Sequence, residues 1–259
     1  MHSVCLTNDD GPYSQGLLRL ADKLSEVVNL TVIVPENQRS ATGKSLTLNR
    51  PLRVNKSTRV NGYNLITHDG TPADSVILAT HFMEKIDLVV SGINAGGNIG
   101  YQSMLTSGTV GAAFEAAIKR IPAIAVSMEA NPADWFNPDG SNREFDAACD
   151  KIQRLALKVL EEGLPDGIDA LNLSLPCEVT EETKIEVARP TRIRMTNKVD
   201  CRIDPHGREY YWFQGIEQSG NQGDDAQIVL ENQQIALSPI IIETVNESDL
   251  DKIRHFTKI

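Results

Sequence analysis

Short apolar segments alternate with stretches of helical periodicity through the first two thirds of the chain. Residues 3–6, 30–34, 88–90 and 121–127 are mainly apolar runs of strand length, whereas apolar residues between positions 17 and 28 recur at the spacing of one helix face. Strands that alternate with helices are typical of βαβ units. Strands that are almost wholly apolar are typical of a parallel sheet covered on both faces. The pattern therefore predicts an α/β fold with a parallel sheet.

The pattern changes after Pro176. Three later segments are strand-like but flanked by polar residues and separated by turns rich in Gly and Asp: 184–188, 210–213 and 235–242. We therefore expect residues from about 180 to 240 to form an antiparallel hairpin region, so that the chain divides into a core (1–180) and an extension with a closing segment (181–259). Because this extension is too polar to close a core alone, we also expect a homo-oligomer.

Length and hydropathy limit the class of protein. A chain of 259 residues suits one large core with an extension. No apolar run approaches the ~18 residues of a membrane span. The N-terminal residues lack the basic region of a signal peptide and pass directly into a strand. We therefore expect a cytoplasmic protein that does not interact with a membrane.

Charge and cysteine spacing argue against three further kinds of site. The formal net charge of −10 disfavours the phosphate backbone of a nucleic-acid duplex as a partner, although a metal ion could neutralise a small anionic substrate locally. The cysteines are scattered and form no CxxC pair, which argues against a thiolate zinc site or a redox dithiol: Cys5, Cys149, Cys177 and Cys201. Reduced thiols are the expectation.

Four short polar clusters follow or precede these predicted elements: residues 7–11, 39–43, 91–100 and 107–111. The first three follow predicted strands, and the fourth opens a predicted helix. In a parallel α/β sheet, ligands bind in the crevice at the carboxyl ends of the strands. A helix N-terminus binds anions. Together the clusters predict one site for a hard cation and a phosphate group.

The first cluster contains two adjacent carboxylates, Asp9 and Asp10. Beyond the strand end, in the turn set by Gly11, both could approach one cation, and hard oxygen ligands suit Mg²⁺, Mn²⁺ or Ca²⁺. The alternative is an Asx-type turn that only caps the next helix. Ser40 and Asn94 offer a hydroxyl and an amide oxygen as further ligands, although each alone is typical of an ordinary turn.

The third and fourth clusters suit a phosphate. Four glycines between Gly92 and Gly100 let the backbone approach a ligand closely, and the alternative is a flexible surface loop. Ser107, Gly108 and Thr109 would present backbone N–H groups at the positive end of a helix dipole. The alternative is an ordinary Ser or Thr N-cap with small residues for close helix packing.

Several familiar motifs are absent. Residues 41–45 resemble the end of a P-loop, but Gln38 stands where that motif requires Gly. The glycines of residues 92–100 do not fit the dinucleotide-binding pattern G-x-G-x-x-G. The five histidines have no metal-ligand spacing and are expected to be structural or exposed: His2, His68, His81, His206 and His255.

The motifs together resemble those of the SurE family, the stationary-phase survival proteins that act as nucleotidases. The matching stretches are TNDDG (7–11), RSATGKSLT (39–47), GTPAD (70–74), SGINAGGNIG (91–100), SGTVGAA (107–113), DPHGR (204–208) with YWF (211–213), and IALSP (235–239). The resemblance runs from about residue 3 to residue 245 and rests on ordered motifs at the right relative positions.

The resemblance implies a Rossmann-like, three-layer α/β/α core with a C-terminal antiparallel β-hairpin extension, in protomers that exchange elements to form dimers or tetramers. It also implies a phosphomonoesterase that uses one divalent ion per chain, Mg²⁺ or Mn²⁺, and hydrolyses nucleoside 5′- and 3′-monophosphates. Carried over by position, the metal ligands are Asp9, Asp10, Ser40 and Asn94. The phosphate or substrate contacts are Asn8, Asn98, Ser107, Gly108 and Thr109.

The primary hypothesis is hydrolysis of a nucleoside monophosphate at a single hard metal ion. Asp9 or Asp10 would also orient or deprotonate the attacking water, and the sequence does not separate that role from metal ligation. One alternative is a related hydrolase on the same site, such as an exopolyphosphatase, a general acid phosphatase or a phosphodiesterase. The other is a protein that binds nucleotides without catalysis.

Overall fold

The computed structural model describes the chain except residues 57–61, 131–143, 193–194, 218–219 and 258–259. In the described part, nine strands form one sheet in the order β3-β4-β2-β1-β5-β6-β7-β11-β8. Their bounds are β1 Ser3–Thr7, β2 Asn29–Pro35, β3 Val54–Lys56, β4 Asn64–His68, β5 Leu88–Ala95, β6 Ala123–Met128, β7 Ala170–Leu175, β8 Ile185–Val187 and β11 Ile235–Ile240. A separate antiparallel hairpin consists of β9 Met195–Ile203 and β10 Glu209–Glu217.

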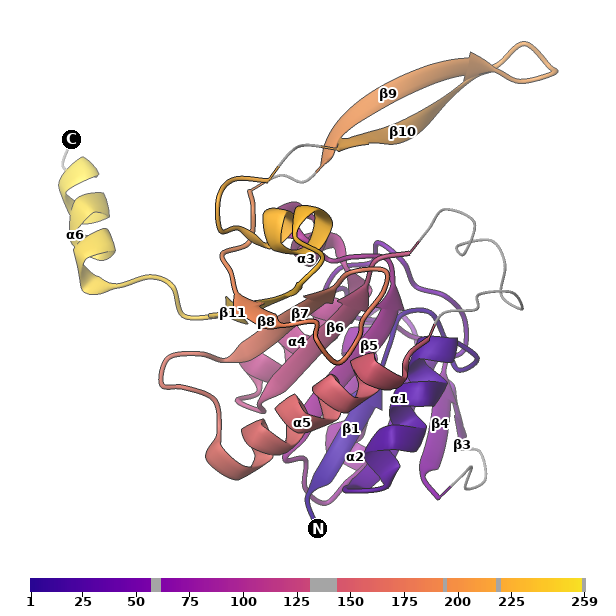
Figure 1. The fold of residues 1–259 in the computed structure, drawn as a ribbon. Coiled ribbons are helices and arrows are strands. Elements are labelled where there is room, and N and C mark those ends of the chain that lie inside the picture. Colours follow the sequence, from indigo (N-terminus) through magenta and orange to yellow (C-terminus); the bar gives the residue numbers. More distant parts are fainter. Residues whose placement is uncertain (57–61, 131–143, 193–194, 218–219, 258–259) are drawn as a thin grey trace.

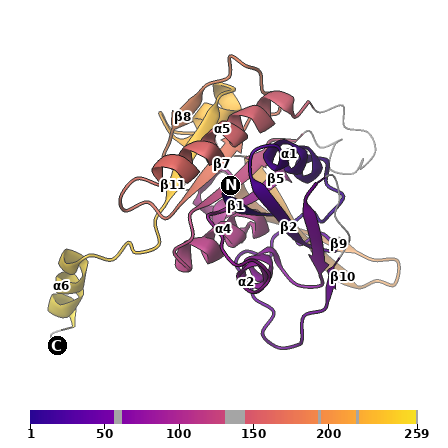
Figure 2. The ribbon, with the colours of Figure 1, turned by 90° about the horizontal axis from the view of Figure 1, so that it is seen from below.

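Helices cover both faces of the sheet (Figure 2). Their bounds are α1 Gln15–Ser25, α2 Pro72–Phe82, α3 Gly100–Thr106, α4 Gly108–Ile118, α5 Asp146–Glu162 and α6 Glu247–Phe256, with one π-helical turn over Gln227–Glu231. Helices α1 and α5 pack on one face and α2 and α4 on the other, each against a separate cluster of buried apolar side chains. The predicted three-layer α/β/α core is confirmed.

The parallel part of the sheet has the Rossmann strand order. Strands β4-β2-β1-β5-β6-β7 are mutually parallel, and their order reverses direction between β1 and β5. Open α/β sheets bind ligands at this switch point, outside the carboxyl ends of the strands. The fold therefore places the expected ligand site at the loops that follow β1 and β5.

The hairpin prediction for residues 180–240 is correct for β9 and β10 but not for the strands on either side. β11 pairs antiparallel with β7 and parallel with β8, so both strands extend the main sheet. The reason is burial: Ile235, Ala236 and Ile240 point into the core and are almost completely inaccessible to solvent. A short polar-flanked strand can still supply such side chains to a sheet edge.

The hairpin and α6 project from the body of the molecule in different directions (Figure 1). No residue of α6 is buried, and its N-terminus is capped by the Asn246 side chain, which accepts a hydrogen bond from the Asp249 N–H at 3.1 Å. No helix in the described residues is long and apolar enough to span a membrane.

Candidate functional site

The loops after β1, β2 and β5 converge at the switch point. The backbone N–H of Arg39 donates to the Asp9 carbonyl at 2.6 Å, which ties the loop after β2 to the loop after β1. The backbone N–H of Ala95, at the end of β5, donates to the Asp10 carboxylate at 3.1 Å. The three polar clusters that the sequence places after strands therefore lie together.

Asp9 is the buried centre of this group. Its side chain accepts a hydrogen bond of 2.5 Å from the hydroxyl of Thr109, in the first turn of α4. The residue is only 3% exposed, and burial together with the neighbouring Asp10 carboxylate raises the pKa of Asp9 to about 6. Two close carboxylates in a low-dielectric setting repel each other unless a cation lies between them. The electrostatics of the pair therefore suit a bound cation.

Glycine at position 108 permits the helix to approach Asp9. A Cβ atom on Gly108 would lie 2.9 Å from the Asp9 Cβ and 3.0 Å from its Oδ2. Ser107 is the N-cap residue of α4, and its hydroxyl accepts a hydrogen bond from the Val110 N–H at 3.1 Å. The first N–H groups of a helix have no intrahelical partner, so this end of α4 presents donors and a positive dipole end beside the carboxylates.

Asn94 and Ser40 each adjoin a residue whose backbone N–H is hydrogen-bonded to one of the two aspartates. The Asn94 amide nitrogen donates to the Gly96 carbonyl at 2.6 Å, so the nitrogen is used within the loop and the side-chain oxygen is the candidate ligand atom. The pairing of β5 with β6 shifts register between Ser91 and Asn94, and such an irregularity re-aims the side chain at the strand end. Ser40 is exposed and directly follows Arg39, whose N–H holds the loop against Asp9.

The residues present fit a hard divalent ion. Within the described ranges, no three His, Cys, Asp or Glu side chains are grouped so that they could hold a metal. The available set is instead two carboxylates with an amide oxygen and a hydroxyl, which is the oxygen chemistry that Mg²⁺ and Mn²⁺ prefer. Asp9, Asp10, Asn94 and Ser40 are the residues that would hold such an ion.

The remaining predicted residues divide into two groups. Asn8 closes the turn after β1: its side chain donates to the Gly11 carbonyl at 2.9 Å and accepts from the Gly11 N–H at 3.1 Å. Asn98 is 7% exposed, and its side-chain nitrogen has no hydrogen-bond partner among the described residues. Asn8 therefore shapes the loop, whereas Asn98 retains a donor for a ligand.

Several supporting residues escape sequence reasoning. Arg39 donates from its guanidinium to the Asp69 carbonyl at 2.8 Å, which links the Ser40 loop to the segment after β4. Ser127 and Asn172 bind the backbone of Asn98. A signal existed for Asn172, because it is an amide side chain in the mainly apolar strand β7. Arg39 begins the second polar cluster, but nothing in the sequence indicates its contact with Asp69.

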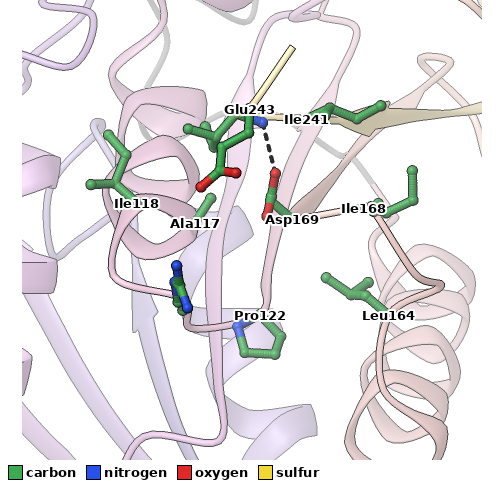
Figure 3. Close-up of a pocket in the computed structure, with 11 residues that line it drawn as sticks. Ala117, Ile118, Pro122, Leu164, Ile168, Asp169, Ile241 and Glu243 are labelled. Carbon is green, nitrogen blue, oxygen red and sulfur yellow. Dashed lines mark hydrogen bonds between the residues drawn. The ribbon is translucent and has the colours of Figure 1, made fainter. Parts of the chain in front are cut away.

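A separate cavity of about 770 Å³ lies at the opposite ends of the strands (Figure 3). Pro122 and Asp169 precede β6 and β7, so this cavity is at the amino edge of the parallel sheet. The Asp169 carboxylate accepts the Ile242 N–H at 2.7 Å, and aliphatic side chains such as Ile118 form much of the wall. The cavity is remote from the carboxylates and supplies none of the predicted site residues.

The fold and the strand-end carboxylates define a Rossmann-like α/β protein with an acidic, phosphate-compatible site at its switch point. The family model described as "Survival protein SurE" matches residues 4–198. The chain therefore belongs to the SurE family.

Individual relatives agree along nearly the whole chain. A protein named 5′-nucleotidase SurE from Thermococcus gammatolerans is 40% identical over 256 residues, covering 97% of this chain and 94% of the relative. Another of that name, from Methanothrix thermoacetophila, is 37% identical and covers 100% of both chains. The crystal structure of the SurE protein from Aquifex aeolicus aligns with a TM-score of 0.81 at 31% identity, over 98% of this chain and 99% of that one.

Proposed function

We propose that this protein is a divalent-metal-dependent phosphomonoesterase that hydrolyses nucleoside 5′- and 3′-monophosphates. The observation that carries the proposal is the buried Asp9 carboxylate, which lies close enough to the Asp10 carboxylate to be repelled by it and accepts a hydrogen bond from Thr109 in the first turn of α4. Names of relatives such as 5′-nucleotidase SurE support the nucleotidase class. The 3′ activity and the need for a metal rest on the site and on the family resemblance.

One group of residues would bind the cation, and another would bind the phosphate. Asp9, Asp10, Asn94 and Ser40 would hold one Mg²⁺ or Mn²⁺ ion through oxygen atoms. When bound, such an ion supplies Lewis-acid polarisation of a phosphoryl oxygen and lowers the pKa of a coordinated water. The carboxylates of the chain would orient the attacking water and accept its proton.

The end of α4 would bind the transferred phosphoryl group. Charge spreads over the equatorial oxygens in the transition state of phosphoryl transfer, so fixed donors aimed there lower the barrier. The backbone N–H groups that open α4 at Gly108 and Thr109 lie beside Asp9, and we expect this helix end to donate to a phosphate oxygen together with the side chain of Asn98. Thr109 also holds Asp9 in place through its hydroxyl.

Two other functions share this site. An exopolyphosphatase or a general acid phosphatase would use the same ion and the same helix end, and it would differ only in what binds outside the phosphate. A protein that binds nucleotides without catalysis would keep the pocket but release no phosphate. The presence of both carboxylates together with Asn94 and Ser40 favours catalysis over binding alone.

The test is phosphate release from a panel of 5′- and 3′-nucleoside monophosphates, with Mg²⁺, Mn²⁺ or a chelator. Polyphosphate and a phosphodiester are run beside them to separate the alternative hydrolases. We expect release from monophosphates that requires the ion and falls at least 100-fold in Asp9→Asn and Asp10→Asn, because an amide replaces an anionic ligand.

Asp150→Asn is the matched control, since Asp150 is an Asp with a Lys23 partner at 2.7 Å on the outside of α1 and α5. This variant should keep full turnover. Nucleotide binding without phosphate release under any ion would establish the non-catalytic alternative. Full turnover in Asp10→Asn would contradict the proposed roles of the carboxylates.

A further inference from the structure

Two central strands carry buried polar side chains that the proposed mechanism does not use. Asn172 of β7 is 1% exposed, and Ser127 at the end of β6 is completely inaccessible. The strands are parallel neighbours, with Ser127 opposite Ser174 and Asn172 opposite Ala125. Buried polar groups in a central strand cost stability unless they make specific hydrogen bonds, so their partners indicate what they are for.

Both side chains bind the backbone of the same residue, Asn98. The Ser127 hydroxyl accepts the Asn98 N–H at 3.0 Å, and the Asn172 amide donates to the Asn98 carbonyl at 3.0 Å. The peptide groups on both sides of the Asn98 Cα are thus held from two different strands. The loop that carries Asn98 has glycines at positions 96, 97 and 100, so its conformation depends on such external contacts.

The side chain of Asn98 is left with an unused donor. The residue is 7% exposed, and its amide nitrogen has no hydrogen-bond partner among the described residues. A buried donor without a partner is costly, and proteins retain one where a ligand satisfies it. An amide N–H binds an anion such as a phosphate oxygen well, because a hydrogen bond to a charged group is about twice as strong as a neutral one.

We propose that Ser127 and Asn172 are positioning residues that hold Asn98 as a phosphate donor. The proposal rests on the proposed function, because it takes the phosphate of the substrate as the ligand of Asn98. The two strand residues do not touch substrate. They fix the main chain of Asn98, and the direction of its side-chain amide follows from that.

The experiment measures binding of inorganic phosphate by calorimetry, in the presence of Mn²⁺, to the full-length protein and its variants. KM and kcat for a nucleoside monophosphate are measured alongside. We expect Ser127→Ala and Asn172→Ala each to weaken phosphate binding and raise KM by about tenfold, a typical loss for a misplaced charge-assisted hydrogen bond. The concentration of Mn²⁺ that gives half-maximal phosphate release should stay within about twofold of wild type, because the carboxylates are untouched.

A double-mutant cycle separates positioning from a general structural effect. If Asn172 acts through the Asn98 side chain, then Asn98→Ala combined with Asn172→Ala should bind phosphate no more weakly than Asn98→Ala alone. Ser238→Ala is the matched control: Ser238 lies opposite Asn172 on β11 and is 1% exposed, and its hydroxyl has no hydrogen-bond partner among the described residues. This control should bind phosphate like wild type.

Two results would overturn the proposal. One is phosphate binding within about twofold of wild type in both Ser127→Ala and Asn172→Ala. The other is a double variant, Asn98→Ala with Asn172→Ala, in which the losses of phosphate affinity of the two single variants multiply. If Asn172→Ala does not fold, Ser127→Ala, which removes a single oxygen, decides the question. Because calorimetry does not depend on turnover, a protein that hydrolyses nothing would refute the proposed function while this test still reports on Asn98.

Discussion

His68 is a buried side chain that stabilises the segment after β4 and has no proposed part in catalysis. It is fully buried at the end of β4; its Nδ1 accepts the Gly70 N–H at 3.0 Å, and its Nε2 lies 2.7 Å from the Ser75 hydroxyl. This arrangement requires a neutral ring, because a protonated Nδ1 could not accept the Gly70 N–H. Burial is the largest cause of a lowered pKa, about 4, and Arg39 lowers it further, against the opposing carboxylates of Asp74 and Asp69.

This shift predicts a pH dependence of stability. The unfolded chain binds a proton on His68 below its ordinary pKa of 6.5, whereas the folded protein binds it only below about 4. The free energy of unfolding should therefore fall as the pH drops from about 6.5 to about 4, by about 3 kcal/mol from this group. Urea denaturation at a series of pH values measures the slope.

The variant His68→Gln should lose that part of the slope, whereas His81→Gln, at an exposed position on α2, should retain it. The difference in slope between the two variants isolates the contribution of His68, because the carboxylates and the other histidines titrate in both. An identical slope in wild type and His68→Gln would show that His68 is not the responsible group.

At the scale of elements, the loop that carries Ser40 is fastened to α3 and α4. The Gly43 N–H donates to the Thr106 carbonyl at 2.8 Å, and a Cβ on Gly111 would lie only 2.4 Å from the Gly43 carbonyl oxygen. Lys44 then pairs with Glu115 at 2.6 Å, and the Glu115 side chain is only 6% exposed. This end of the loop is therefore held by close backbone packing and a largely buried ion pair.

Loss of Lys44 should loosen this attachment. Removing one partner of a buried pair leaves an uncompensated charge, so we expect Lys44→Met to lower the free energy of unfolding by about 2 kcal/mol. This loss of stability is smaller than is usual for a broken buried ion pair, because Lys44 is itself partly exposed and Lys119 also approaches Glu115, at 3.4 Å. The concentration of Mn²⁺ needed for activity should rise, since Ser40 lies on the same loop.

Lys119→Met is the matched control, because it removes a cation from the same carboxylate without touching the loop. It should cost less than about 1 kcal/mol and leave the requirement for Mn²⁺ unchanged. Equal effects of the two substitutions on metal activation would mean that the loop is not held through Lys44.

At the scale of the whole molecule, the projecting elements expose large apolar side chains. Tyr211 and Phe213 share one face of the β9–β10 hairpin and are 59% and 78% exposed. Helix α6 exposes Leu250, Ile253 and Phe256. Contiguous exposed apolar surface on extended elements is characteristic of interaction sites. We therefore maintain the prediction of a homodimer or homotetramer.

Light scattering at micromolar concentration tests this prediction, and we expect a mass of two or four chains. The double substitution Tyr211→Ser and Phe213→Ser should shift the distribution towards smaller species, because it removes apolar area from the hairpin. Lys198→Ser, on the neighbouring strand, removes charge but little apolar area and should not. A mass near one chain for the wild type would contradict the prediction.

The main features of the core could be predicted from local sequence because each depends on a local pattern. The apolar runs identify the parallel strands, and the polar residues at or just beyond the ends of those strands mark the edge where Asp9 and Asn94 lie. The strands β8 and β11 were harder to place, since a short segment flanked by polar residues joins a sheet or leaves it according to its partners. Asn172 was overlooked because its role is defined by Asn98, 74 residues away.

The sequence by itself determined the α/β class, the strand ends that carry the carboxylates and the helix that Ser107 caps, because hydrophobic period, turn residues and capping act within a few residues. Only the tertiary structure decided that the Thr109 hydroxyl binds Asp9, that Asn172 and Ser127 hold Asn98, and that burial raises the pKa of Asp9. The physical reason is that hydrogen-bond geometry and desolvation depend on which distant segments the fold brings together.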